Sequence, residues 1–147
     1  MAGASHYTLP LPSFDKPVKA LIVVAPYYRD IADHMIAGAR ATLEQAGATH
    51  DLIEVPGALE VPAAISQAFR LSDFDVFVAL GCVIRGETTH YDTVCNDSSR
   101  ALQLMGLQGL CIGNGILTVE NRAQAEVRAD PKGQDKGGGA ADAAGRR

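Results

Sequence analysis

The 147-residue sequence has few cysteines, no long apolar run and no excess of basic residues. Its three cysteines, Cys82, Cys95 and Cys111, are not spaced as a CxxC pair. This argues against a disulfide framework and fits a reducing cytoplasm. No apolar run reaches the length of a transmembrane helix, and a net charge of −4 is not typical of nucleic-acid binding. We therefore expect a cytoplasmic protein with no membrane and no nucleic-acid partner.

The N-terminal segment, residues 1–16, has no regular apolar period and contains Pro10 and Pro12. It also lacks the basic-then-apolar layout of a signal peptide, so we interpret it as an extended or mobile arm. Residues 17–147 then form one domain. With 47% of the chain apolar, this domain is long enough to bury a core. The chain has no internal repeat, and its one low-complexity segment is the glycine-rich stretch 133–145.

Apolar runs alternate with segments of helical period along this domain. The runs ALIVVA at 20–25 and VFVAL at 76–80 are typical of strands that are buried on both faces. No hairpin signal separates the strands, so the alternation predicts right-handed βαβ crossovers and a parallel sheet. The predicted strands are 18–25, 50–55, 75–80 and 110–113, and the predicted helices start near residues 30, 62, 91, 118 and 140.

Single residues indicate where the helices begin and end. Asp30 can cap the first helix and Gly47 can stop it. Phe69 is expected on the buried side of the second helix. Thr118 can cap the fourth. The last helix is expected only at 140–144, after the glycine run, because glycine lowers helix stability.

Residues 80–92, LGCVIRGETTHYD, join the third strand to the next helix. Polar residues there lie at the carboxyl end of a strand, where open parallel sheets bind ligands, and beside helix N–H groups that can hold an anion. His90 is the leading catalytic candidate, because an imidazole moves protons near neutral pH. The alternative is a structural histidine at a helix start. A metal site made by His90 and Asp92 would have too few ligands.

Four stretches carry a resemblance to a known family. They are VPGALEVP at 55–62, GCVIRGETTH at 81–90, NGILTVEN at 114–121 and DKGG at 135–138. In this order and spacing they resemble the signatures of the lumazine synthases, the penultimate enzymes of riboflavin synthesis. Four motifs in register are far more specific than one. The resemblance spans residues 17–144.

The resemblance implies an α/β fold, a flavodoxin-like three-layer α/β/α sandwich around a four-stranded parallel sheet. It implies a transferase that condenses 5-amino-6-(D-ribitylamino)uracil with 3,4-dihydroxy-2-butanone 4-phosphate to 6,7-dimethyl-8-ribityllumazine, releasing phosphate and water. That reaction needs no metal and no organic cofactor. The family forms homopentamers, some of which close into icosahedral shells, and its sites lie between subunits.

The resemblance also implies roles for individual residues. His90 matches the family's proton-transfer histidine, and Tyr27 matches an aromatic that stacks on the heterocycle. Arg128 and Lys136 match phosphate-binding residues that the adjacent subunit supplies; alone, they would be a solvated helix-end arginine and a loop lysine. The other implied substrate-binding positions are Ala58, Leu59, Glu60, Cys82, Val83, Ile84, Glu87, Thr88 and Asn114.

Some of these positions carry narrower expectations. Glu60 could bond sugar-like hydroxyls or could simply charge a helix start. Residues 82–84 would present backbone groups to a pyrimidine edge. Cys82 is not expected to be a nucleophile, because nothing near it in sequence activates a thiol. Glu87 would bind an anion through its backbone N–H, and Asn114 would face the substrate with its backbone.

Two other functions stay open. A non-catalytic flavin-binding or shell-forming relative would keep the aromatic residue but lose His90 or Arg128, and this chain has both. A flavodoxin-like nucleotide binder would need a phosphate loop after the first strand, and residues 26–29, PYYR, are not glycine-rich. The chain departs from the family in its short, glycine-rich C-terminal segment, and in having Tyr28 where the family commonly has asparagine.

Overall fold

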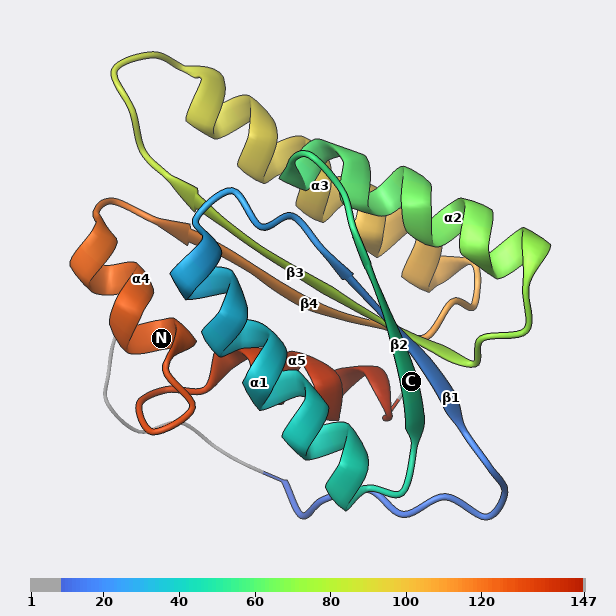
Figure 1. The fold of residues 1–147 in the computed structure, drawn as a ribbon. Helices are drawn as coiled ribbons and strands as arrows, with labels where there is room; N and C mark the ends of the chain where they lie inside the picture. The colour runs from blue at the N-terminus through green and yellow to red at the C-terminus, as the bar shows by residue number, and fades with distance from the viewer. Residues whose placement is uncertain (1–8, 147) are drawn as a thin grey trace.

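The computed structural model describes residues 9–146, so residues 1–8 of the predicted arm and Arg147 lie outside the described residues. A parallel sheet with the strand order β2-β1-β3-β4 runs through the molecule (Figure 1). All of its strand pairs are parallel, which confirms the predicted βαβ connections. The strands are β1 Lys19–Val24, β2 Thr49–Glu54, β3 Val76–Ile84 and β4 Ile112–Val119.

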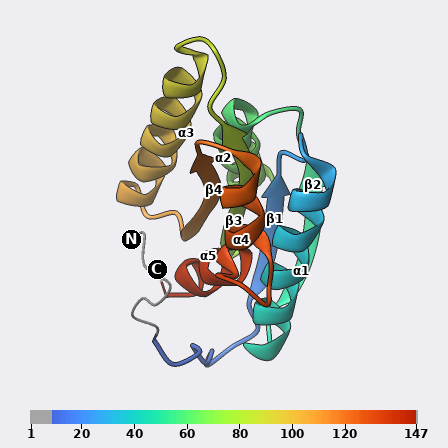
Figure 2. The same cartoon turned by 90° about the vertical axis from the view of Figure 1, so that its left-hand side faces the viewer.

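Helices cover both faces of the sheet (Figures 1 and 2). This is the flavodoxin-like three-layer α/β/α sandwich that the resemblance implies. Among residues 9–146, no helix is long and apolar enough to span a membrane. One face carries α1 Arg29–Gln45, α4 Arg122–Ala129 and α5 Lys136–Ala144; the other carries α2 Val61–Leu71 and α3 His90–Leu107, with the short 3-10 helix η1 Ala58–Glu60 before α2.

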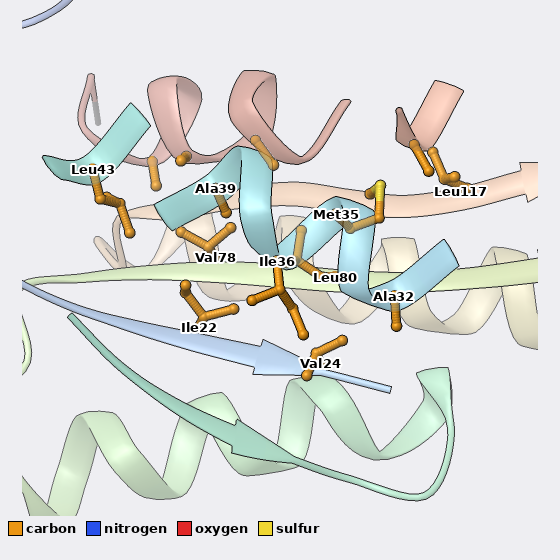
Figure 3. Close-up of a cluster of buried hydrophobic side chains, with 14 of the residues drawn as sticks. Ile22, Val24, Ala32, Met35, Ile36, Ala39, Leu43, Val78, Leu80 and Leu117 are labelled. Carbon is orange, nitrogen blue, oxygen red and sulfur yellow. The ribbon is translucent and has the colours of Figure 1, made fainter. Parts of the chain in front are cut away.

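The central strands are buried on both faces, so their side chains divide between two cores. Ile22 and Val24 of β1 pack on the α1 side, as Figure 3 shows, whereas Leu21 and Val23 pack on the α2 and α3 side. Each fully buried aliphatic side chain contributes about 1.5–3 kcal/mol. The apolar stripe of α1 is also confirmed, since its members are at most 7% exposed: Ile31, Met35, Ile36, Ala39 and Leu43.

Two strands extend further than the apolar runs predict. β3 continues past Leu80 to Ile84, and β4 continues past Gly113 to Val119. The two extensions pair with each other, with Ile84 opposite Val119. Backbone pairing therefore carries both strands through the glycines and polar residues that interrupt the apolar pattern. β1 ends at Val24, opposite Leu80, so the sheet has a step where β3 extends beyond β1.

The ends of α1 match the prediction at one end only. Gly47 follows the helix with a φ of 84°, a conformation that glycine adopts without strain. At the other end, Asp30 is not the cap, because Tyr28 occupies the N-cap position. The Asp30 carboxylate instead pairs with Arg122 of α4, and this guanidinium lowers the pKa of the carboxyl group.

Two further predictions are wrong for reasons of packing and pairing. Thr118 lies inside β4, and Asn121 caps α4, with its Oδ1 accepting a hydrogen bond from the Gln124 N–H at 2.9 Å. Phe69 is 48% exposed, although its ring contacts Phe77 edge-on at 6.4 Å between centroids. It lies at the border of the core that α2 covers.

Helix α5 begins four residues earlier than predicted and contains the glycine run. The cause is its close approach to α1. A Cβ built on Gly137 would overlap the carbonyl oxygen of Met35 and lie 2.8 Å from its carbonyl carbon. Glycine is therefore needed for the two helices to pack, and this packing offsets the low helix propensity. Just after the C-terminal end of α5, Arg146 donates a hydrogen bond to the Pro10 carbonyl oxygen of the N-terminal segment.

Candidate active site

A cavity of about 480 Å³ lies at the carboxyl ends of β1 and β3, beside η1 and the start of α3. We call it the strand-end pocket. Ligands bind at this edge in parallel α/β sheets, and the volume suits a small-molecule ligand. The pocket brings together eight of the predicted site residues: Tyr27, Ala58, Leu59, Glu60, Cys82, Val83, Ile84 and His90.

The step in the sheet forms one wall of this pocket. The Ala25 N–H donates to the Leu80 carbonyl at 3.0 Å, so the backbone groups of Leu80 point toward β1. Along a strand these directions alternate, and the backbone groups of Cys82 and Ile84 therefore point the same way. They lie beyond the last residue of β1, Val24. The pocket is thus bordered by main-chain donors and acceptors that no β1 residue covers.

Tyr27 lies at the rim of the pocket, where β1 has ended. It is 77% exposed, far more than a core-covering aromatic residue would be. The ring of Tyr28 contacts it edge to face, with 5.0 Å between centroids. Tyr28 is half-buried, and burial raises the pKa of its phenol. Tyr28 also lines the pocket, although it was not among the predicted site residues. Its position directly after the end of a strand is the one feature of the sequence that could have predicted this.

His90 is the first residue of α3, and its backbone N–H donates to the Thr88 hydroxyl at 3.3 Å. Its side chain is exposed and lines the strand-end pocket. Val94, one helical turn later, lines the pocket too; the i,i+4 spacing from His90 could have predicted this. Glu87 and Thr88 lie in the exposed turn before α3 and line neither this pocket nor the one described below.

The thiol of Cys82 is poorly suited to nucleophilic attack. Burial raises its pKa to about 11, and the charge of Arg122 opposes this only in part. The thiolate is the reactive form of cysteine. At neutral pH the side chain is therefore a protonated thiol in the pocket wall, in agreement with the expectation that it is not a nucleophile.

A second cavity, of about 910 Å³, lies along β4 beside α4 and α5. We call it the β4 pocket. It contains three of the other five predicted residues, Asn114, Arg128 and Lys136. Arg128 lies in the last turn of α4 and donates from Nη1 to the Gln124 carbonyl at 3.1 Å. Asn114 Oδ1 accepts a hydrogen bond from the Ile116 N–H at 3.0 Å, so this side chain is held against the backbone of its own strand.

The two pockets have no lining residue in common within residues 9–146. The structure therefore brings His90 together with the seven other predicted residues of the strand-end pocket but does not bring Arg128 and Lys136 to the same cavity. Within the described residues, no three His, Cys, Asp or Glu side chains are grouped as metal ligands. The absence of a cofactor stays a prediction.

A family model described as 6,7-dimethyl-8-ribityllumazine synthase matches residues 17–146. The chain belongs to this family. A lumazine synthase relative from Jannaschia sp. is 62% identical over 144 residues, covering 98% of this chain and 81% of the relative. One from Novosphingobium aromaticivorans is 54% identical over 126 residues, covering 86% and 91%.

A third relative, from Rhizobium meliloti, is named 6,7-dimethyl-8-ribityllumazine synthase 1 and is 55% identical over 135 residues, or 88% of each chain. These results confirm the resemblance of the four motifs to the lumazine synthases. The relatives are named as synthases, so the family is one of enzymes, and the non-catalytic alternative is not favoured.

Proposed function

We propose that the chain condenses 5-amino-6-(D-ribitylamino)uracil with 3,4-dihydroxy-2-butanone 4-phosphate in riboflavin biosynthesis. The products are 6,7-dimethyl-8-ribityllumazine, phosphate and water. Membership of the lumazine synthase family carries the proposal. The strand-end pocket supports it, because eight family-implied residues border one cavity there. A cytoplasmic location belongs to the same proposal, since three cysteines without a CxxC pair fit a reducing compartment.

The strand-end pocket is the proposed site for the pyrimidine. Tyr27 offers an exposed aromatic face on which a flat heterocycle can stack. The open backbone groups of Cys82 and Ile84 can pair with the donors and acceptors of a pyrimidine edge. Glu60, at the end of η1, can accept hydrogen bonds from the ribityl hydroxyls.

Arg128 and Lys136 are the proposed phosphate ligands. A guanidinium binds phosphate through two parallel N–H donors, and an ammonium adds a second positive charge. The bond from Arg128 to Gln124 uses only part of the donor capacity of the guanidinium. The backbone N–H groups of Glu87 and Thr88, beside the start of α3, add an anion-binding helix terminus.

The proposed chemistry consists of proton transfers around two bond-forming steps. The 5-amino group of the pyrimidine adds to the ketone, and loss of water gives an imine. Loss of the proton from the carbon that carries the remaining hydroxyl then expels phosphate, with the electron pair of the C–O bond leaving on the phosphate oxygen, and the resulting enol becomes a ketone. The ribitylamino nitrogen adds to this ketone, and loss of a second water completes the ring. His90 can carry the protons, Arg128 and Lys136 stabilise the leaving charge, and holding two reactants together supplies much of the rate.

We also propose a homo-oligomer, at least a pentamer, with sites shared between subunits. Its support is the separation of the two pockets, because His90 needs the phosphate ligands near it. In a ring, Arg128 of the partner subunit would complete the strand-end pocket, and identical heterologous contacts close such a ring. An icosahedral shell is the larger form of the same assembly.

The direct test of function is to incubate the purified protein with both substrates and follow the lumazine absorbance. We expect turnover that requires both substrates and continues in the presence of a chelator. A protein that binds riboflavin but forms no lumazine would support the non-catalytic relative and contradict the proposal.

The test of the shared site combines light scattering with subunit exchange. Scattering should give a mass of at least five subunits. At substrate concentrations below the wild-type KM, His90→Ala and Arg128→Ala proteins should each lose most of their activity. Mixed rings should regain part of it, because some interfaces then hold both intact residues. A fully active monomer would contradict the assembly; rings that exchange subunits without regaining activity would contradict the shared site alone.

A further inference from the structure

Asp135 is the one non-glycine residue with a positive φ in the part of the chain that the structure describes, at φ 48° and ψ 53°. This left-handed conformation is uncommon for residues other than glycine, although Asp and Asn tolerate it best. Asp135 is also the N-cap of α5, and its Oδ1 accepts a hydrogen bond from the Gly138 N–H at 3.2 Å. The cap therefore holds a conformation that the backbone alone does not favour.

The carboxylate of Asp135 is half-buried and lies between α1 and α5. A Cβ built on Gly38 of α1, or on Gly138 of α5, would overlap one of its oxygens. The Cβ on Gly138 would also lie 2.9 Å from the Thr42 hydroxyl. Two glycines on facing helices thus leave space for this one side chain. Burial raises its pKa, while the Gly138 N–H lowers it in part.

Backbone hydrogen bonds connect Asp135 to the end of α4. Its N–H donates to the Asp130 carbonyl at 3.1 Å, and the Gln134 N–H donates to the Val127 carbonyl at 3.0 Å. The Asp135 carbonyl accepts a hydrogen bond from the Gly139 N–H at 3.0 Å. The last turn of α4, the loop and the first turn of α5 are therefore one hydrogen-bonded unit.

Arg128 and Lys136 stand at the two ends of this unit. Arg128 lies in the last turn of α4, and Lys136 is the first residue of α5 and follows Asp135 directly. The direction in which the Lys136 side chain leaves the backbone depends on the dihedral angles of Asp135. A residue that relaxed to the ordinary right-handed region would turn the first residue of α5 and change the separation of the two cations.

We propose that Asp135 is a positioning residue for the phosphate site and acts through Lys136. This inference rests on the proposed function, in which Arg128 and Lys136 bind the phosphate of 3,4-dihydroxy-2-butanone 4-phosphate. Gly38 and Gly138 contribute to the same positioning, because a side chain at either position would displace the Asp135 carboxylate. An asparagine at position 135 should position Lys136 equally well, since it adopts the same conformation and its Oδ1 can accept the same hydrogen bond.

The test measures KM for each substrate in Asp135→Ala and Asp135→Asn. We expect Asp135→Ala to raise KM for the phosphate substrate about tenfold and to leave KM for the pyrimidine within about twofold. Asp135→Asn should raise neither KM by more than about twofold. Equal rises for both substrates, or an Asp135→Asn protein as impaired as Asp135→Ala, would overturn the proposal. If Asp135→Ala does not fold, Gly38→Ala takes its place with the same expected result, because its methyl group would displace the Asp135 carboxylate.

A double-mutant cycle separates positioning from a general structural effect. In a Lys136→Ala background, Asp135→Ala should raise KM for the phosphate substrate by no more than about twofold, because the residue it positions is gone. A full tenfold effect in that background would overturn the proposal. If Lys136→Ala and Arg128→Ala themselves leave this KM unchanged, it is the proposed function of the β4 pocket that fails.

A pair of variants on α1 supplies the matched control. Gly38→Ala should raise KM for the phosphate substrate, because its methyl group displaces the Asp135 carboxylate. Ala37→Gly, at the exposed neighbouring position, should lower stability by about 1 kcal/mol through helix propensity alone. It should leave both KM values unchanged; a rise there matching that of Gly38→Ala would mean that lost stability explains the effect.

Discussion

The contact between α1 and α5 predicts opposite effects for two glycines that are two residues apart. A Cβ on Gly137 would overlap the Met35 carbonyl oxygen and lie 2.8 Å and 2.9 Å from the Met35 C and Cα atoms. These are backbone atoms of a buried helix turn, so no rotamer change can relieve the overlap. A Cβ on Gly139 would have no heavy atom within 4 Å outside its own helix turn. Gly137→Ala should therefore destabilise the fold and Gly139→Ala should stabilise it.

The magnitudes follow from two opposing terms. Alanine gains about 1 kcal/mol over glycine in a helix interior, and this gain applies at both positions. Overpacking costs about 1–3 kcal/mol when flexible groups can adjust, and backbone atoms place Gly137 at or above the upper end. The net change is then a loss of about 2 kcal/mol for Gly137→Ala and a gain of up to about 1 kcal/mol for Gly139→Ala.

Thermal unfolding followed by circular dichroism measures the difference. For a chain of this size, 1 kcal/mol shifts Tm by about 2–4 °C. We expect a fall of about 4–8 °C for Gly137→Ala and a rise of up to about 4 °C for Gly139→Ala. Protein concentration must be equal in all samples, since the proposed assembly would make Tm depend on it. A Gly137→Ala protein as stable as Gly139→Ala would refute the view that the glycine run exists for helix packing.

Three further predictions concern the pockets. His90→Ala should lower kcat about 10²-fold and leave the circular dichroism spectrum unchanged. The control is His34→Ala, which changes an exposed histidine on α1 and should keep full turnover. Equal turnover in both variants would remove His90 from the mechanism. Arg128→Ala should raise KM for the phosphate substrate about tenfold or more. Arg70→Ala, which changes another arginine in a last helical turn, should leave this KM unchanged. An equal rise in KM for both substrates in Arg128→Ala would mean that Arg128 has a structural role. Burial raises the pKa of Cys82 from 9.0 to about 11, so at pH 8 it should have about one hundredth of the thiolate of a free cysteine. Iodoacetamide should therefore label Cys82 at about one hundredth of the rate of a free cysteine or more slowly, and rapid labelling would contradict this.

The layers of the fold could be predicted because they depend on apolar periodicity. The continuous runs of β1 and β3 and the stripe of α1 from Ile31 to Leu43 need only burial to take their places. A similar reason holds for His90 and Tyr27, since residues at the carboxyl ends of parallel strands meet at one edge; most of the other residues of the strand-end pocket were predicted from the resemblance. In both cases short stretches of sequence contain the physical cause.

The differences arise where the cause lies in a distant segment. The extensions of β3 and β4 depend on their pairing with each other. The glycine run of α5 becomes helical because Gly137 meets Met35 of α1, about one hundred residues earlier in the chain. Asp30 is drawn from capping α1 to pairing with Arg122 of α4. No local pattern contains these partners, so propensity alone gives the wrong answer.

The step between β1 and β3 bears on how the pocket can change under selection. The surface proposed to recognise the pyrimidine, at Cys82 and Ile84, is main chain, and a point substitution does not remove a backbone carbonyl or, except for proline, a backbone N–H. Natural sequences can therefore vary their side chains at these positions while still binding the same heterocycle. An inhibitor that bonds only to this exposed strand edge would leave few single substitutions through which resistance could arise.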